Sequence, residues 1–182
     1  MKSTIIYIHG LDSSPEAQTA QAVRAHFKGQ KFIMPSVDHR SDPDKIRAQM
    51  DALGRSLAKE DDPIVVGSSA GGLWADYLAI KFGYKTVLIN PALKPTVLFP
   101  KFGIPENYIA KYAKLEAMVA GKPRRNVVVY SGDKDDVVPT SVVHTHYKSP
   151  IVLKGEGHRL QNTKPVFDMI QSMIGNFPED ER

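Results

Sequence analysis

Residues 63–66 form an apolar run that leads directly into the pentapeptide Gly67-Ser68-Ser69-Ala70-Gly71, and a helix-patterned stretch follows it. A strand that turns abruptly into a helix through Gly-x-Ser-x-Gly holds its serine on a strained, exposed turn, and the residues two positions away must be tiny. Gly67 and Gly71 meet this demand for Ser69. The motif therefore predicts a nucleophilic serine between a strand and a helix. A phosphate cradle at the helix N-terminus is the alternative, but the lysine of a P-loop is missing.

Short apolar runs alternate with segments of helical periodicity along the chain. Six runs are predicted to be buried strands, at residues 4–8, 32–34, 64–66, 86–89, 127–130 and 151–153. Helices are predicted in the gaps, and Ser13 and Glu16 have the spacing of a capping box for the first of them. This alternation indicates an α/β fold of three layers in one domain over residues 1–182. We expect a mostly parallel sheet of about six strands with helices on both faces.

The loops that follow the first and third strands are predicted to face each other. If the strand order is 2-1-3-4-5-6, the order reverses between strands 1 and 3, which is where ligands bind in such sheets. Gly10, in the loop after the first strand, would let the backbone of Leu11 approach Ser69. The amides of Leu11 and Ala70 would then point at one oxygen atom and form an oxyanion hole.

A serine hydroxyl needs a base to become a good nucleophile, and the base needs a third group to orient it. Behind a turn of this kind the acid is expected before the histidine in the sequence. Residues 131–139 follow the fifth strand and contain three aspartates. Asp135 is the preferred acid, and Asp136 and then Asp133 are the alternatives. His158 follows two glycines after the sixth strand and is the predicted base.

Together these motifs resemble those of the α/β-hydrolase superfamily, and more narrowly those of the small YqiA-type bacterial esterases. The resemblance covers nearly the whole chain and rests on Tyr7-Ile8-His9-Gly10 with Ser13-Ser14-Pro15, Gly67 to Gly72, Asn90-Pro91-Ala92, and Gly155 to His158. It implies Ser69 as nucleophile, His158 as base, an aspartate near position 135 as its orienter, and oxyanion donors at Leu11 and Ala70. It also implies activity on short acyl esters or acyl thioesters. Arg159, directly after the histidine, departs from the family's pattern.

Residues 91–122 form the longest stretch between strands and are interpreted as a small lid. Prolines interrupt its first part, which is predicted to be a stiff apolar loop, and helical spacing follows up to Gly121. Leu93 and Phe99 of this segment, with Gly10, are the predicted substrate contacts. The alternative is that the segment only covers the sheet. Between residues 91 and 125, seven lysines and arginines outnumber two glutamates. They are either solvated surface residues or a means of attracting anionic substrates.

Composition argues against several other classes of protein. The chain has no cysteine, which excludes disulfides, thiol nucleophiles and cysteine-bound zinc, and no histidine or aspartate pattern predicts a metal. No run is long enough for a membrane span or a signal-peptide core, and no aromatic-basic pattern suggests nucleic acid. We therefore expect a cytoplasmic protein with no cofactor, no metal, no nucleic acid and no membrane partner. Disorder is expected only at residues 178–182.

The function predicted from the sequence is a serine carboxylesterase that cleaves small acyl esters or thioesters through an acyl-enzyme. Two alternatives stay open at this point. One is a non-catalytic binding module on a hydrolase fold. The other is a peptidase or perhydrolase that uses the same nucleophile, since these reactions share Ser69 and the oxyanion hole.

Overall fold

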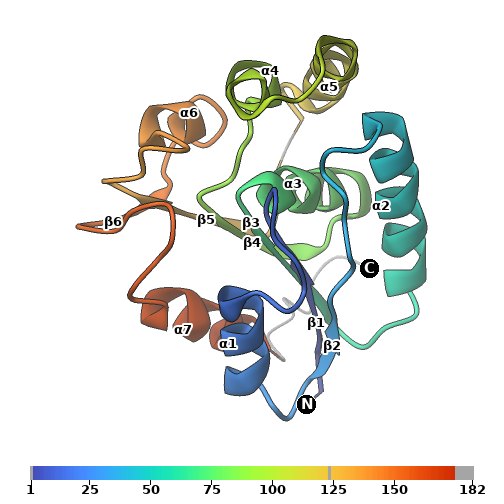
Figure 1. The fold of residues 1–182 in the computed structure, drawn as a ribbon. Helices are drawn as coiled ribbons and strands as arrows, with labels where there is room; N and C mark the ends of the chain where they lie inside the picture. The colour runs from blue at the N-terminus through green and yellow to red at the C-terminus, as the bar shows by residue number, and fades with distance from the viewer. Residues whose placement is uncertain (1, 123, 175–182) are drawn as a thin grey trace.

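The computed structural model describes residues 2–122 and 124–174, which form a sheet with helices on both faces (Figure 1). Neighbouring strands are parallel throughout, and the strand order is β2-β1-β3-β4-β5-β6. The strands are β1 (Thr4–Ile8), β2 (Lys31–Ile33), β3 (Pro63–Ser68), β4 (Lys85–Ile89), β5 (Val127–Gly132) and β6 (Ile151–Leu153). The predicted fold class is confirmed, and the strand order is the one on which the predicted placement of the site depended. The tail at residues 178–182, where disorder was expected, lies outside the described residues.

The prediction that all six strands are buried is wrong at the two edges of the sheet. Ile151 and Val152 of β6 are 41% and 45% exposed, and Phe32 and Ile33 of β2 are only partly buried. An outermost strand has a neighbour on one side only, and both edge strands are three residues long. By contrast, every residue of β1 and β4 is buried.

Alternate residues of each central strand point to opposite faces of the sheet, and each face has its own core. Ile5 and Tyr7 pack with the two helices on one face, α1 and α7, whereas Ile6 and Ile8 pack with the helices on the other. Figure 1 shows α1 and α7 below the sheet and the remaining helices above it. These helices are α1 (Gln18–His26), α2 (Pro43–Leu57), α3 (Ala70–Phe82), α5 (Glu106–Val119), α6 (Thr140–His144) and α7 (Lys164–Met173).

Helix α3 lies in the interior and is apolar on nearly every side. Its first ten residues are all buried, including Trp74 with no exposed surface. A helix with no polar face is stable only when other elements surround it, and α3 packs against β3, β4, α2 and β1. It ends at Gly83, whose φ of 77° is the left-handed conformation that glycine adopts without strain. The helix that begins directly after Ser69 is therefore held on all sides.

Helices α1 and α2 begin in different ways. Helix α2 begins at Pro43, and the Asp42 side chain caps it by accepting the amide of Asp44 at 2.9 Å. The predicted capping box of Ser13 and Glu16 is not formed, because α1 begins only at Gln18. The Glu16 amide instead donates to the hydroxyl of Ser14, so this segment is a turn that leads away from β1.

The lid segment, residues 91–122, is more helical than predicted. Its first part is not a loop but a short helix, α4 (Pro95–Leu98), followed by a 3-10 turn, η1 (Phe99–Phe102). Both α4 and η1 have a proline among their first two residues, where the backbone N–H would have no partner within the helix. The prolines therefore exclude one long helix but are compatible with two short ones. Leu98 and Phe99 are buried in the same core cluster as Trp74. The lid therefore packs into the same core as α3.

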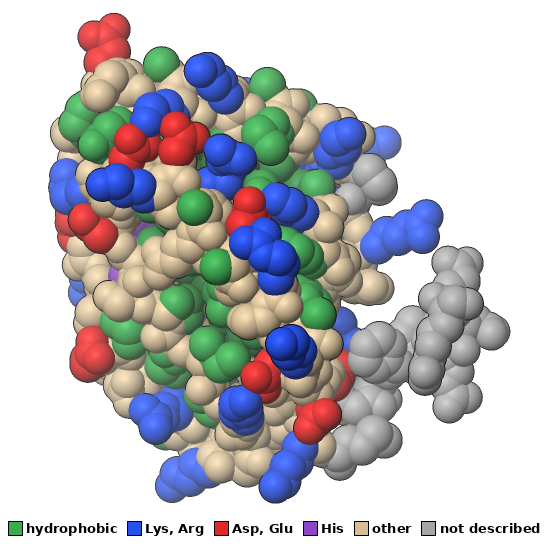
Figure 2. Space-filling model, turned by 90° about the vertical axis from the view of Figure 1, so that its right-hand side faces the viewer, with side chains coloured by type: hydrophobic (Ala, Val, Ile, Leu, Met, Phe, Trp, Pro, Cys, Tyr) green, Lys and Arg blue, Asp and Glu red, His purple; other side chains and the backbone are tan. Residues whose placement is uncertain are grey.

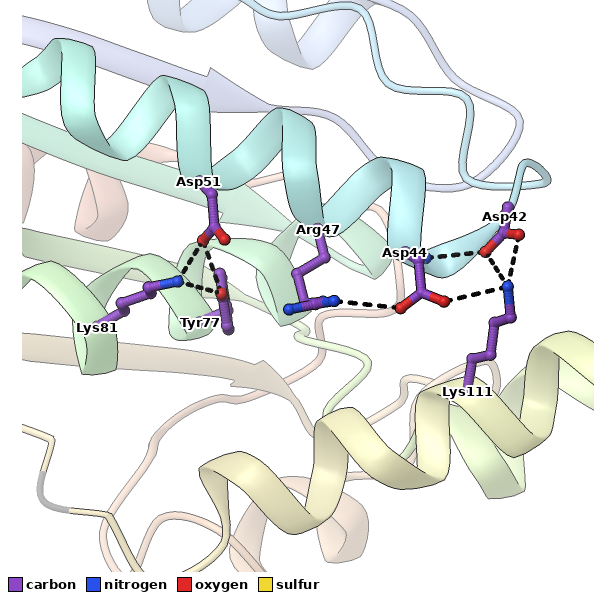
Figure 3. Close-up of polar contacts among 7 residues, drawn as sticks. All are labelled: Asp42, Asp44, Arg47, Asp51, Tyr77, Lys81 and Lys111. Atoms are coloured by element: carbon purple, nitrogen blue, oxygen red, sulfur yellow. Dashed lines mark hydrogen bonds and ion pairs between the residues drawn. The ribbon is translucent and has the colours of Figure 1, made fainter.

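Lys111, one of the basic residues of the lid, is paired with carboxylates of the protein. Its ammonium group reaches from α5 to two carboxylates at the start of α2, at 2.5 Å from Asp42 and 3.1 Å from Asp44 (Figure 3). Asp51, further along α2, accepts from Lys81 and Tyr77 of α3 in the same way. These contacts tie three helices together, so Lys111 is engaged by protein carboxylates rather than directed at a ligand.

Charges of both signs are mixed on the face of the molecule that carries α2. Figure 2 shows lysine and arginine side chains interspersed there with acidic ones, around a central apolar area. This mixture gives the face no uniform sign of charge. None of the helices within residues 2–122 and 124–174 has the length and apolar character needed to cross a membrane.

Candidate active site

Ser69 occupies a strained turn between β3 and α3. Its φ of 53° and ψ of −121° are unusual for a residue with a side chain. The backbone around it fixes this conformation: the Ser69 amide donates to Ile89 at 3.0 Å, and its carbonyl accepts the amides of Gly72 and Ala92 at 2.9 Å each. The turn is thus held by β4 and by the residues that follow β4.

The two glycines of the motif are required because α3 passes very close to the ends of β1 and β3. A Cβ atom on Gly67 would lie 2.5 Å from both the Ala75 side chain and the Gly71 carbonyl oxygen. A Cβ atom on Gly71 would collide with the carbonyl oxygens of Ile8 and His9 at the end of β1. Helix α3 can pass this close to the sheet only without side chains at these positions, as the sequence motif predicts.

The structure brings together the three side chains that the sequence singled out. Nε2 of His158 lies 3.1 Å from Oγ of Ser69, and Nδ1 of His158 lies 2.8 Å from Oδ2 of Asp135. The carboxylate partner assigns the ring proton to Nδ1, which leaves Nε2 free to accept the Ser69 hydroxyl proton. The Asp135 side chain has no exposed surface, and that of His158 is 22% exposed. A buried carboxylate therefore holds a partly exposed imidazole ring next to the Ser69 hydroxyl.

Asp135 is distinguished from its two neighbours by its contacts. Its second oxygen, Oδ1, accepts the amides of Val137 and Val138 at 2.9 and 2.8 Å, so both carboxylate oxygens are used. Asp133 instead accepts the amide of Gly155 at 2.6 Å and closes the turn before the histidine. Asp136 is exposed. Of the three aspartates, Asp135 is the one in contact with His158.

Asn90 holds the acid loop and the histidine loop together, and sequence reasoning gave it no role. Its side-chain oxygen accepts the Gly132 amide at 2.8 Å, and its nitrogen donates to the carbonyls of Gly157 and His158 at 3.1 and 2.9 Å. Asn90 is fully buried and has a positive φ of 45°. The available signal was a polar amide at the end of a buried strand, directly before Pro91.

The two predicted oxyanion donors flank Ser69. Ala70 is the first residue of α3, and Leu11 lies in the loop after β1, next to Gly10. Within residues 2–122 and 124–174, neither amide donates a hydrogen bond to a protein acceptor. A Cβ atom on Gly10 would lie 3.1 Å from the Ser69 side chain, so the loop after β1 passes close to Ser69. Both N–H groups therefore remain available to a substrate oxygen.

Two buried histidines support the loop that carries Leu11. The His9 ring donates from Nδ1 to the Gly10 carbonyl at 2.9 Å and accepts the Val37 amide at Nε2. His39 donates from Nε2 to the His9 carbonyl at 2.8 Å. Burial lowers the pKa of His39 to about 4, although the bond to His9 opposes the shift, so His39 is neutral at physiological pH.

Ser69 and His158 lie between two cavities of different chemistry. The first, of about 470 Å³, is here called the polar cavity; hydroxyl side chains contribute much of its wall, namely Tyr7, Ser13, Ser14, Ser68, Thr19 and Thr163. The second, of about 480 Å³, is called the apolar cavity, and lid and loop residues line it, including Ala92, Leu98, Phe99, Phe102, Val137 and Val138. The site is therefore divided into two compartments that meet at the nucleophile.

The predicted substrate contacts fall differently in these compartments. Gly10 lines the polar cavity and Phe99 lines the apolar cavity. Leu93 is buried and lines neither of them, although the amide of its neighbour Ala92 donates to the Ser69 carbonyl at 2.9 Å. The contact of Leu93 with substrate therefore stays a prediction.

Arg40 connects three segments at the mouth of the site. Its guanidinium group binds both carboxylate oxygens of Asp12 at 2.7 Å and donates to the carbonyl of Phe102 at 3.0 Å. Asp12 belongs to the loop after β1, and Phe102 ends the 3-10 turn of the lid. This bridge closes one side of the apolar cavity, which Asp12 and Phe102 both line.

Residues suited to hold a metal ion do not gather in the described part of the chain. No group of three or more histidine, aspartate or glutamate side chains lies together within residues 2–122 and 124–174.

Sequence comparison relates this chain to one protein family. The profile described as "Uncharacterised protein family (UPF0227)" matches residues 4–175. The UPF0227 protein YcfP of Escherichia coli O9:H4 is 24% identical over 175 residues, which cover 92% of this chain and 97% of that protein. The match thus extends over β1 to α7 and includes every site residue described above.

Three solved structures share the architecture. Est1E from Butyrivibrio proteoclasticus has a TM-score of 0.79 at 18% identity, over 96% of this chain and 89% of that one. Alpha/beta hydrolase domain-containing protein 10 from mouse has a TM-score of 0.70 at 23% identity, over 94% and 89%. A monoacylglycerol lipase from Paleococcus ferrophilus has a TM-score of 0.69 at 13% identity, over 93% and 94%. The likeness establishes an α/β-hydrolase fold.

Proposed function

The chain belongs to the UPF0227 family and has the α/β-hydrolase fold, and from this premise we propose that it is a serine hydrolase that cleaves small carboxylic esters or thioesters. The observation that carries the proposal is the hydrogen-bonded series from Ser69 Oγ to His158 Nε2 and from His158 Nδ1 to Asp135. Such a series converts a weak hydroxyl into a nucleophile. The esterase and lipase names among the structural neighbours agree with this class of reaction.

The first half of the reaction forms an acyl-enzyme. Ser69 Oγ attacks the carbonyl carbon of the substrate while His158 Nε2 takes the hydroxyl proton. The carbonyl oxygen becomes an oxyanion and accepts the amides of Leu11 and Ala70, where the start of α3 adds the positive end of its dipole. The intermediate then expels the alcohol or thiol, which leaves with the proton from His158. Asp135 stabilises the positively charged imidazole between these two proton transfers.

The second half of the reaction releases the acid. Water enters the position that the alcohol has left, and His158 removes its proton as the oxygen attacks the acyl carbon. The same two amides stabilise the second oxyanion, and Ser69 leaves as the hydroxyl after it recovers a proton from His158. The two cavities support this sequence, because one can retain the acyl group while the other empties.

Labelling with a fluorophosphonate probe tests the proposal. The wild-type protein should be labelled at Ser69, and the adduct can be located by peptide mass spectrometry. Ser69→Ala should abolish both the labelling and the hydrolysis of a butyrate ester, whereas the neighbouring control Ser68→Ala should still be labelled at Ser69. Folded wild-type protein that neither reacts with the probe nor hydrolyses the ester would contradict the proposal.

A further inference from the structure

The charges of the residues that line the polar cavity do not sum to zero. Three of them line it, namely Asp12, His158 and Arg159. Asp12 is neutralised, because both of its carboxylate oxygens bind the guanidinium group of Arg40 at 2.7 Å. His158 is engaged by Asp135 and Ser69. Arg159 is left as the uncompensated cation in the wall of this cavity.

Arg159 has no partner of its own within the protein as described. Its guanidinium group makes no hydrogen bond or ion pair with any side chain of residues 2–122 and 124–174, and the side chain is exposed. It also follows His158 directly and lines both cavities. A cation at this place lies beside the reacting atoms and can contact a bound substrate on either side of the scissile bond.

The apolar cavity is unsuited to an anion. Its walls are mostly apolar side chains of the lid and of residues 137–138, and the exposed carboxylate of Asp136 also lines it. Arg159 lines this cavity too, but an anion placed there would otherwise meet apolar walls and the like charge of Asp136, so it would lose water for few polar contacts. The apolar cavity therefore fits a hydrocarbon acyl group, which leaves the polar cavity for the alcohol or thiol portion.

We propose that Arg159 selects substrates whose alcohol or thiol portion carries an anionic group, a carboxylate or a phosphate. This inference rests on the proposed hydrolase function and names its substrate class. A guanidinium group presents paired N–H donors that match the oxygen atoms of either anion, which makes arginine better suited than lysine to this contact. The hydroxyl groups of Ser13, Ser14 and Thr163 in the same cavity can donate further hydrogen bonds to these oxygens.

The test compares three butyrate esters of benzyl alcohol that differ only in the para substituent. One carries a carboxylate, one a phosphate and one a neutral carboxamide, so the first two arms distinguish the two anions. The ratio of kcat/KM for each anionic ester to that for the carboxamide is the readout, because a general disturbance of Ser69 or His158 changes all three values alike. This ratio is measured for wild type, Arg159→Gln and Arg159→Lys at low salt.

Two controls remove a positive charge elsewhere. Arg24→Gln lies on α1, and Lys111→Gln lies on the lid, where Asp42 and Asp44 already bind the ammonium group. Neither residue lines the two cavities. Both variants should keep the wild-type ratio of kcat/KM values. Salt screens the interaction between a distant surface charge and the bound anion, so loss of that charge should change binding little.

The expected result is a wild-type ratio above one that falls about fivefold in Arg159→Gln, with part of the preference retained in Arg159→Lys. Of the carboxylate and the phosphate, the anion that Arg159 favours is the one whose kcat/KM ratio falls more in Arg159→Gln. An unchanged ratio in Arg159→Gln, or an equal fall in Arg24→Gln, would overturn the inference while leaving the hydrolase function intact. Failure of folded wild type to hydrolyse any of the three esters would contradict the proposed function and this inference with it.

Discussion

The side-chain nitrogen of Asn90 donates to the carbonyl oxygen of His158 at 2.9 Å, while its oxygen accepts the Gly132 amide on the acid side of the site. One buried amide thus fixes the spacing between two loops that converge on Ser69. The position of the histidine depends on this bridge, although Asn90 touches neither the nucleophile nor the acid.

Asn90→Ala should lower both stability and activity. The Gly132 amide and two carbonyls would lose their partner, which costs about 2 to 3 kcal/mol of unfolding free energy. The loosened histidine should lower kcat more than tenfold. Asn126→Ala is the matched control, because Asn126 also has a positive φ, of 57°, but is exposed at the other end of β5. Equal loss of kcat in the two variants would refute this role of Asn90.

Asp135→Asn should leave the protein folded and nearly inactive. An amide at this position can still accept from Val137 and Val138, but it no longer stabilises the positively charged imidazole of His158. We expect kcat to fall about 10³- to 10⁴-fold on a butyrate ester. Asp136→Asn is the control and should keep kcat within a few-fold of wild type. Loss of activity in Asp136→Asn alone would move the role of the acid to that residue.

Gly10→Ala tests the close approach of the oxyanion loop to the nucleophile. The added methyl group would lie 3.1 Å from the Ser69 side chain, so either the loop or the serine must shift by a few tenths of an ångström. Because the Leu11 amide moves with this loop, kcat should fall by about one to two orders of magnitude, less than on complete removal of a donor. Gly29→Ala has open space around it and should leave kcat unchanged.

His39 should make stability depend on pH below neutrality. Its pKa is about 4 in the folded protein against an ordinary value near 6.5, so the unfolded chain binds a proton that the folded protein does not. Stability is complete above the unfolded value and declines as pH falls from about 6.5 to 4, by roughly 3 kcal/mol. Urea unfolding of His39→Gln, which can still donate to His9, should show a shallower decline. The exposed control His144→Gln should follow wild type.

A buried ion pair joins Arg124, between the lid and β5, to Asp76 of α3. Arg124 donates from Nε and Nη2 to Asp76 at 3.0 and 3.1 Å, and the hydroxyl of Tyr147 donates to the same carboxylate. Arg124→Met should cost about 3 to 5 kcal/mol, because a buried charge loses its partner. Adding Asp76→Asn should recover part of this loss, since the site then holds no unpaired charge. Urea denaturation of both variants measures the difference, and a cost below about 1 kcal/mol for Arg124→Met would contradict a buried pair.

The fold class could be predicted because it depends on short-range patterns, whereas the strand order was only the condition for placing the site. Apolar runs set the strands, and the Gly-Ser-Ser-Ala-Gly turn sets the position of Ser69 between a strand and a helix. The chain order of acid and base placed Asp135 and His158 at neighbouring strand ends. These features follow from side-chain period and steric exclusion, which are local properties of the sequence.

Contacts between distant segments could not be predicted in the same way. The bridge from Asn90 to two loops depends on where three strand ends meet, and the Arg40 contacts depend on how the lid folds back. The prolines of the lid excluded one long helix, but they did not reveal that Pro95 and Pro100 each begin a short one. Loop residues 133–136 contain three similar carboxylates, and only the geometry of their amide partners separates Asp135 from Asp133.

The division of the site into two cavities has a consequence for how substrate specificity can change under the proposed function. The apolar cavity is lined largely by the lid and by residues 136–138, whereas the polar cavity is lined largely by the β1–α1 loop and by residues 158–167. We expect substitutions at residues that line only one cavity to change acceptance of the acid or of the alcohol separately. Ser69, at the turn between β3 and α3, lines both cavities and stays in place, so the two halves of substrate specificity can evolve one at a time.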